Sequence, residues 1–284
     1  MTGPLAWFAR RGPVGKPRIV PELPDVESFR QVFAAHAVKR PISGVDVLDA
    51  GVLRDVTADR LSRTLPGQRF SEPRRHGKWL IAPVGSHAVI LHFGMTGSLY
   101  WTGPGEQPHR HDRVIFAFPD GELRYRDMRK LQGLRLVDSP RGVDDVLADV
   151  GPDATEVSRE RLRELLDGRR KQVKAALTDQ SIMAGIGNLL ADEILWRARI
   201  HPRTSCVHLG RDELARLDAA MGRVLRQSIK AGRVPVTKSW LTGRRDDPSG
   251  SCPRCGTLLA HDRTGGRTTT WCPHCQPDEP VQPR

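Results

Sequence analysis

SCPRCGTLLAHDRTGGRTTTWCPHC, residues 251–275, carries two cysteine pairs, Cys252/Cys255 and Cys272/Cys275, each with two residues between its members. Each pair places two thiolates on one tight turn, and the two turns together provide the four ligands of a tetrahedral zinc site. Gly265-Gly266 lies between the pairs with β-compatible residues on both sides, which predicts a hairpin. Because four protein ligands leave no position for water, we expect one structural Zn2+ ion. A zinc ribbon also occurs in otherwise unrelated proteins, so this motif alone leaves the activity open.

The overall charge favours a polyanionic partner. Among 284 residues there are 45 Lys and Arg against 33 Asp and Glu, a net charge of +12. Such a balance fits DNA, RNA or an acidic membrane surface, with nucleic acid the preferred reading. No apolar run approaches the ~18 residues of a membrane span, and residues 1–20 do not resemble a secretory signal. Four of the five cysteines are paired as metal ligands, which indicates a reducing compartment, and Cys206 is expected to be a lone thiol.

Hydrophobic patterning predicts an α+β fold. A short helix should follow Pro21, with Pro24 in its first turn and Val26, Phe29 and Phe33 on one face. Strands are expected at 44–48, 79–83, 88–93, 98–101, 114–118, 123–125 and 134–137, and helices at 58–65, 159–166, 171–180, 189–199 and 211–230. We therefore expect an N-terminal β-sandwich (or barrel) with a leading helix, a helical domain and a C-terminal zinc-finger β-hairpin.

The expected organisation has six parts. They are an extension at 1–20, a β domain at 21–138, a hinge at 139–152, a helical domain at 153–245, the zinc finger at 246–276 and a disordered tail at 277–284.

A glycine turn between two predicted helices is a candidate phosphate site. In Ala184–Asn188 the glycines permit a sharp turn, and the following helix N-terminus would offer N–H groups to a phosphate. The helix before it carries the basic residues Arg169, Arg170, Lys171 and Lys174. A plain helical hairpin with a solvated basic face explains the same pattern, and is favoured when this motif is taken alone.

Seven motifs in a fixed order resemble one known family. They are PELPDVE at 21–27, RRHGKWL at 74–80, LHFGMTGSL at 91–99, HRHDRVIF at 109–116, LRYRDMRKLQG at 123–133, DQSIMAGIGNLLADEILWRARIHP at 179–202, and the cysteine finger with RTTTW. Together they resemble the formamidopyrimidine-DNA glycosylase and endonuclease VIII family over residues 21–276. The resemblance implies a helix–two-turn–helix domain and a bifunctional DNA glycosylase and AP lyase of base excision repair. It also implies a monomer in the bacterial cytoplasm, acting on damaged double-stranded DNA with no membrane partner.

The resemblance assigns catalytic roles to four residues. Pro21 matches the N-terminal proline that forms a Schiff base, and Glu22 matches the adjacent acid/base. Lys78 matches the lysine that assists β-elimination, and Arg267 matches the finger arginine that assists δ-elimination and binds phosphate. A secondary amine bound to the sugar gives an iminium ion, which acidifies the neighbouring C–H bond and allows phosphate to leave. The sequence leaves open whether cleavage ends after β-elimination.

The resemblance also assigns DNA contacts. Because the damaged base must leave the stack, side chains are needed to fill the gap. Met95, Arg129 and Leu131 match the gap-filling residues, and Asn188 matches the asparagine that holds the DNA backbone. His111 and Arg169 match further contacts, and Lys174 belongs to the same expected DNA-binding surface.

The extension departs from the family pattern. A proline nitrogen inside a chain is an amide without a basic lone pair, so Pro21 cannot form a Schiff base while Val20 precedes it. We interpret the start as misassigned: a GUG codon at Val20 would initiate with methionine, whose removal frees Pro21. The alternative is a genuine tail and a non-catalytic damaged-DNA-binding protein.

Two further departures concern lesion choice, and the first is Leu131, which stands where purine-specific members carry phenylalanine. Asp25 in place of the usual glutamate is a smaller change, one methylene shorter. The stretch at 231–250 is short for the loop that caps 8-oxoguanine. We therefore predict weak recognition of 8-oxoguanine and more activity on oxidised pyrimidines, formamidopyrimidines or abasic sites. A zinc-ribbon RNA-binding or transcription factor ranks lower, because it leaves Glu22, Lys78 and the gap-filling set unexplained.

Overall fold

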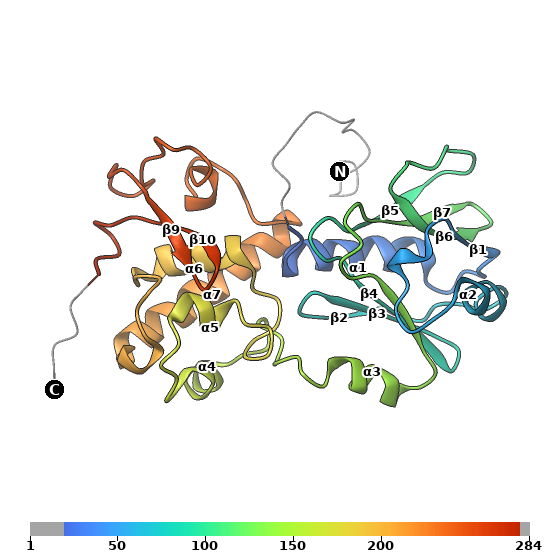
Figure 1. The fold of residues 1–284 in the computed structure, drawn as a ribbon, viewed down its shortest axis with the longest axis horizontal. Helices are drawn as coiled ribbons and strands as arrows, with labels where there is room; N and C mark the ends of the chain where they lie inside the picture. The colour runs from blue at the N-terminus through green and yellow to red at the C-terminus, as the bar shows by residue number, and fades with distance from the viewer. Residues whose placement is uncertain (1–19, 279–284) are drawn as a thin grey trace.

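The computed structural model describes residues 20–278, so most of the predicted extension and of the predicted tail lies outside the described part. These residues form a β-rich body and a helical body that lie side by side, with the zinc-finger hairpin on the helical one (Figure 1). None of the helices within residues 20–278 combines the length and the apolar character that crossing a bilayer requires. The predicted α+β class is confirmed.

Two four-stranded antiparallel sheets build the N-terminal domain. One has the order β1 (Gly44–Val47), β6 (Asp112–Phe118), β7 (Gly121–Arg126), β5 (Ser98–Thr102), and the other β2 (Arg74–His76), β3 (Trp79–Val84), β4 (His87–His92), β8 (Leu134–Val137). The inward residues of both sheets form one apolar core, with Leu80, Phe116 and Leu123 fully buried. This is the sandwich that the alternating patterns predict.

Helix α1 (Leu23–Ala37) joins the two sheets. Its buried face contributes Val26, Phe29 and Phe33 to the sandwich core, at the spacing of one helix face. Helix α2 (Ala58–Thr64) begins at Thr57, whose hydroxyl accepts a hydrogen bond from the Arg60 N–H group. The sequence patterns therefore located both helices, but they missed strand β2, which has three polar residues and pairs with β3 along one edge only.

The second half of the chain is helical. It contains α3 (Pro140–Leu147), α4 (Arg159–Leu166), α5 (Val173–Leu177), α6 (Asn188–Ala198) and α7 (Arg211–Ala231), with short 3-10 turns η3 (Cys206–His208) and η4 (Leu241–Gly243) after α6. Helix α3 lies inside the predicted hinge and packs Val143 against Ile81 and Ile90 of the sandwich. Helix α5 is shorter than predicted and ends at Leu177, where the Thr178 hydroxyl donates to the Lys174 carbonyl.

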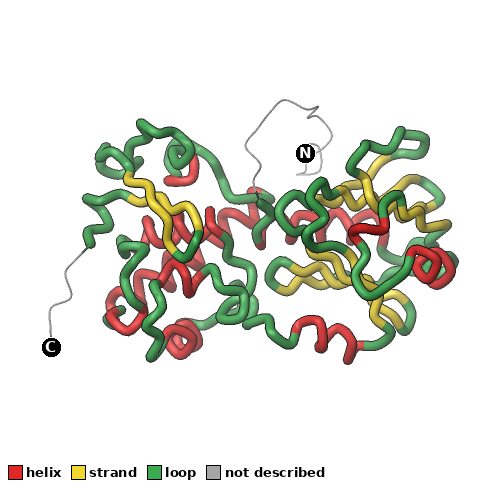
Figure 2. The backbone as a smooth tube through the Cα atoms, viewed as in Figure 1, coloured by secondary structure: helices red, strands yellow, loops and turns green. Residues whose placement is uncertain are grey.

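The finger hairpin, drawn as two paired strands in Figure 2, pairs β9 (Ala260–Thr264) with β10 (Arg267–Trp271). The predicted Gly265-Gly266 pair forms its turn. Both glycines have positive φ, 57° and 75°, a conformation that other residues rarely adopt. The finger packs on α6, where Trp196 and Leu241 meet Cys252 and Cys272 in a small core. The hairpin is thereby held against the helical domain.

Candidate functional site

The segment before helix α1 is tied to the turn before helix α6. The Glu22 carboxylate accepts hydrogen bonds of 3.0, 2.8 and 3.1 Å from the backbone N–H groups of Gly187, Leu189 and Leu190. A helix N-terminus leaves these donors without intrahelical partners, and its positive end favours a carboxylate. Glu22 is 1% exposed, and Pro21 is buried beside it. The structure therefore places the predicted nucleophile and acid/base at the domain junction.

The two glycines of this turn make room for the N-terminal segment. A Cβ at Gly187 would lie 2.2 Å from Glu22 Cδ, and a Cβ at Gly185 would lie 2.5 Å from Leu23 Cδ1. The Leu23 N–H group also donates to the Gly185 carbonyl at 3.1 Å. The N–H groups that were a candidate phosphate site are therefore occupied by Glu22. The glycines thus permit a close approach between this turn and the Glu22–Leu23 segment of the same chain.

Lys78 lies with Gly77 at the tip of the β2–β3 hairpin, and this tip contacts the turn before α6. A Cβ at Gly77 would lie 2.5 Å from Ala184 Cβ, and Gly77 has φ of 56°. The Gly77 N–H group donates to the Asp153 carboxylate at 2.6 Å, and the Arg75 guanidinium pairs with the same carboxylate. Lys78 and the Pro21–Leu23 segment therefore meet at one place, although they come from different parts of the chain.

The charges around Lys78 tune its proton affinity. Burial lowers the pKa of Lys78, the Arg267 charge lowers it further, and the charges of Glu22 and Asp25 oppose this. Burial also raises the pKa of Asp25 to about 7, and its carboxylate accepts the Glu22 N–H group at 3.0 Å. The junction thus holds an amine that loses its proton more easily than usual and a carboxyl group that exchanges a proton near neutral pH.

The three predicted gap-filling residues lie on two neighbouring loops. Arg129 Nη1 is 3.0 Å from Met95 Sδ, and the Arg129 N–H group is held by Thr96 Oγ1 and by Asp127, both at 3.0 Å. Met95 is 37% exposed and Leu131 is 50% exposed, which is unusual for large apolar side chains. The structure therefore brings Met95 and Arg129 together and leaves Leu131 accessible two residues away.

His111 and Arg169 lie in different domains. His111 is in the loop between β5 and β6, where Arg113 Nη2 approaches its Nδ1 atom at 3.1 Å. Partial burial and the neighbouring Arg110 and Arg113 charges lower the pKa of His111. Arg169 follows α4, is exposed, and donates through Nε to the Leu165 carbonyl at 2.6 Å. Both stay candidate DNA contacts.

Asn188 contacts the finger strand next to Arg267. Lys174, expected to contact DNA, is instead paired with a buried carboxylate. Arg267 is exposed at the start of β10, and Asn188 Nδ2 donates to the Thr268 carbonyl at 2.9 Å. Lys174 is fully buried, and its Nζ atom lies 2.6 Å from Asp192 Oδ1. The expectation that Lys174 contacts DNA is therefore corrected, because its ammonium group has no access to a phosphate.

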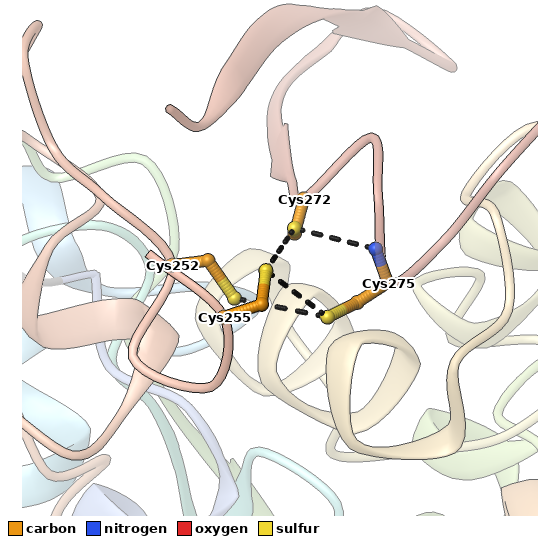
Figure 3. Close-up of side chains that lie close together, drawn as sticks. All are labelled: Cys252, Cys255, Cys272 and Cys275. Atoms are coloured by element: carbon orange, nitrogen blue, oxygen red, sulfur yellow. Dashed lines mark hydrogen bonds between the residues drawn. The ribbon is translucent and has the colours of Figure 1, made fainter. Parts of the chain in front are cut away.

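The four finger cysteines fit one zinc ion. Their sulfur atoms lie within 4.8 Å of one another, with Cys255 and Cys272 at 3.5 Å and Cys252 and Cys275 at 3.9 Å (Figure 3). A tetrahedral site with Zn–S bonds of ~2.3 Å has sulfur separations of about 3.8 Å. Trp196 Nε1 also donates to Cys252 Sγ at 3.3 Å, which favours a thiolate there. The predicted structural zinc site is confirmed. Cys206 lies apart and is buried, and burial raises its pKa to about 11.

Several buried charges near these residues were not predicted as site residues. Asp153 and Arg75 join the domains beside Lys78, and Asp192 and Arg245 lie behind Arg267. Asp192 did carry a sequence signal, because together with Glu193 it interrupts an otherwise apolar helix segment in LLADEILW. A buried acid of that kind needs a cationic partner, but the sequence does not show which one.

Comparison with known proteins accounts for nearly all described residues. A model of the formamidopyrimidine-DNA glycosylase N-terminal domain matches residues 20–134, one of its H2TH domain matches 150–239, and one of the zinc finger found in FPG and IleRS matches 251–277. The formamidopyrimidine-DNA glycosylases of a Synechococcus species and of Symbiobacterium thermophilum are each 34% identical. Both alignments cover 91% of this chain, and they cover 99% and 90% of those relatives.

Comparison with solved structures points to the same family. Lactococcus lactis Fpg in complex with DNA containing an abasic site has a TM-score of 0.83 at 28% identity, over 91% of this chain and 100% of that one. MutM in complex with DNA containing carbocyclic 8-oxo-G has a TM-score of 0.83 at 27% identity with the same coverage. With its sandwich, its helical domain and its zinc finger in matching order, the chain belongs to the formamidopyrimidine-DNA glycosylase family.

Proposed function

We propose that this protein is a bifunctional DNA glycosylase and AP lyase that excises oxidised bases from double-stranded DNA and nicks the strand. The observation that carries the proposal is the meeting of Pro21, Glu22 and Lys78 at the domain junction. Relatives that bind abasic-site and Fapy-dG DNA support it. The exposed Met95, Arg129 and Leu131 are available to enter the base stack.

The chemistry follows from the groups at the junction. A free Pro21 nitrogen attacks C1′ of the extruded nucleoside, and the base leaves with the electron pair of the glycosidic bond and gains a proton. Opening of the C1′–O4′ bond then gives an iminium ion, and in this proposal Glu22 supplies the proton that O4′ requires. The iminium acidifies C2′–H, and loss of this proton releases the 3′ phosphate. Loss of the C4′ proton releases the 5′ phosphate, beside which Arg267 acts.

The proposal requires that the Pro21 nitrogen be an amine. Within the full chain it is an amide joined to Val20. We therefore infer that the active form begins at Pro21, and that it acts as a monomer on DNA in the bacterial cytoplasm. A chain that keeps the preceding residues would bind damaged DNA through the same surface without cutting it.

Borohydride trapping on DNA with one abasic site tests whether the protein forms a Schiff base and whether the active form begins at Pro21. We expect a covalent adduct from a chain that begins at Pro21 and none from the full chain, because borohydride fixes the protein to the DNA only where the Pro21 amine has formed an iminium with the sugar. A Pro21→Gly variant of the short chain keeps a terminal amine and controls for proline itself. Binding of the abasic DNA without an adduct from either chain would favour the non-catalytic alternative.

A further inference from the structure

One backbone carbonyl in the finger is held by three side chains. The Thr268 carbonyl, next to Arg267, accepts hydrogen bonds from Lys174 Nζ at 2.9 Å, Asn188 Nδ2 at 2.9 Å and Arg245 Nη2 at 3.0 Å. These donors come from α5, from the first turn of α6 and from the loop after η4. A carbonyl oxygen has two lone pairs, so three donors saturate it. The main chain beside Arg267 is thus fixed to three separate elements.

Two of these donors share a buried carboxylate. Asp192 lies with Oδ1 at 2.6 Å from Lys174 Nζ and with Oδ2 at 3.3 Å from Arg245 Nη1. Its Oδ2 atom also accepts the Thr270 N–H group of β10 at 3.3 Å. The side chains of Lys174 and Asp192 are 0% exposed and that of Arg245 is 6% exposed. We call Lys174, Asp192 and Arg245 the finger cluster. The cluster therefore holds β10 by hydrogen bonds at both Thr268 and Thr270.

Burying the three charged groups of the finger cluster costs hydration free energy. Charges that leave water lose their hydration, and apolar residues of similar volume stabilise a fold at least as well. The cluster also holds two cations against one carboxylate, so it places an excess positive charge behind the strand that carries Arg267. Within residues 20–278 the Arg267 guanidinium has no hydrogen bond or ion pair of its own. The part of Arg267 that the cluster holds is therefore its backbone, from which the side chain starts.

We propose that the finger cluster positions Arg267 for the phosphate that leaves in the second elimination, with Asp192 as its central positioning residue. The three hydrogen bonds to Thr268 fix the origin of the Arg267 side chain, and the excess positive charge favours an anion in front of it. This inference rests on the proposed function of Arg267, and it extends that function to residues that do not touch DNA.

The test is a comparison of two elimination steps in the zinc-loaded chain that begins at Pro21. With enzyme in excess over DNA containing one abasic site, the rates of 3′-phosphate and 5′-phosphate release are measured separately. We expect Asp192→Asn to slow the second elimination by about tenfold and to leave the first and the borohydride adduct nearly unchanged. The amide keeps an acceptor for Thr270 but removes the charge that holds both cations. Asp218→Asn, which breaks a surface pair with Arg159, is the matched control.

A double-variant cycle separates positioning from stability. If Asp192 acts through Arg267, Asp192→Asn has no further effect on the second elimination in an Arg267→Ala background. Equal slowing in both backgrounds overturns the inference, and so does an unchanged ratio of the two rates. A wild type that stops after the first elimination overturns it too. A wild type that forms no adduct contradicts the proposed function instead.

A second pair of variants, at Arg245, tests the same inference in case Asp192→Asn does not fold. Arg245→Gln is expected to reproduce the selective slowing, and Arg245→Lys to recover most of it, because lysine keeps the charge opposite Asp192. Zinc content and melting temperature are measured for each variant. Slowing that follows zinc loss, and affects both eliminations alike, would show that the cluster only stabilises the finger.

Discussion

The Asp153 carboxylate of the helical domain accepts a 2.6 Å hydrogen bond from the backbone N–H group of Gly77, the residue directly before Lys78. The Arg75 guanidinium pairs with the same carboxylate, and Thr155 donates to it through its N–H group at 2.9 Å. A single buried acid thus fixes the hairpin tip that carries the proposed catalytic lysine. The position of Lys78 depends on the contact between the domains as much as on its own strand.

Replacing this acid should weaken both the fold and the first chemical step. Asp153→Asn removes one of the two carboxylates that pair with the buried Arg75 guanidinium and leaves Glu27 as the other, so we expect a loss of ~2 kcal/mol in the free energy of unfolding. Urea unfolding measures it, and the rate of Schiff-base trapping should fall as well. Asp149→Asn, at an exposed position close by, is the control. Equal stability of the two variants would contradict the role given to Asp153.

A methyl group at Gly187 should displace Glu22. The added Cβ would lie 2.4 Å from Glu22 Oε1, so the three hydrogen bonds to the start of α6 cannot keep their geometry. We expect Gly187→Ala to lose about 2 kcal/mol of stability and to form the borohydride adduct more slowly. Gly44→Ala, where nothing lies within 4 Å of the new Cβ, should do neither. A fully active Gly187→Ala variant would argue against the Glu22 contact.

The carboxyl group of Asp25 should make stability depend on pH near neutrality. Burial raises its pKa from 3.8 to about 7, so folding favours the protonated form. Its stabilising contribution is complete below pH 3.8 and is lost as the pH rises through about 7. Between about pH 4 and about pH 7, wild type should therefore lose stability relative to Asp25→Asn, by at most roughly 1.4 kcal/mol per pH unit, and the difference should level off at higher pH. Thermal melts of wild type, Asp25→Asn and the exposed-site control Asp46→Asn measure it.

Removal of zinc should weaken DNA binding before it unfolds the rest of the protein. The finger core is small and its strands depend on the four cysteines, whereas the two larger cores contain no metal ligand. A chelator should release one zinc ion per chain and weaken binding to abasic-site DNA by at least ~10-fold, while far-ultraviolet circular dichroism changes little. Cys206→Ala should keep its zinc. Tight binding by the zinc-free chain would refute this.

Lesion choice stays a prediction from the sequence. Leu131 stacks less well than an aromatic ring, and the stretch at 231–250 is short, so excision of 8-oxoguanine should be slower than excision of formamidopyrimidines or oxidised pyrimidines. Single-turnover rates on duplexes that differ only in the lesion decide it. Comparable rates on 8-oxoguanine and thymine glycol would count against the prediction.

The sequence predicted elements whose residues interact locally and missed those that depend on distant partners. Helix α4 and the finger hairpin follow from periodicity and from a glycine pair, which are local signals. Strand β2 exists because β3 pairs with it, and its three residues carry no pattern of their own. Basic charge placed Lys174 on the surface, but Asp192, eighteen residues later, draws it into the core.

The same distinction applies to the candidate site. Motif order located Pro21, Glu22, Lys78 and Arg267, but not the contacts between them. The glycine turn at 184–188 was a candidate phosphate site, with a plain helical hairpin as the favoured alternative, and only the three-dimensional arrangement shows that Gly185 and Gly187 accommodate Leu23 and Glu22. Residues that position others, such as Asp153 and Arg245, have no local signature because their partners lie far away in the chain.

The hydrogen bond from Gly187 to Glu22 spans 165 positions of sequence, and this has a consequence for biosynthesis. Leu23 belongs to the core of the helical domain, which leaves the ribosome long after the first residues. A nascent chain that has completed only its sandwich therefore has an N-terminal segment without its final partners. The segment that carries the proposed nucleophile Pro21 therefore reaches its final geometry only when synthesis is almost finished. Long-range contacts of this kind form slowly, so the proposed site is assembled only after the rest of the molecule is present.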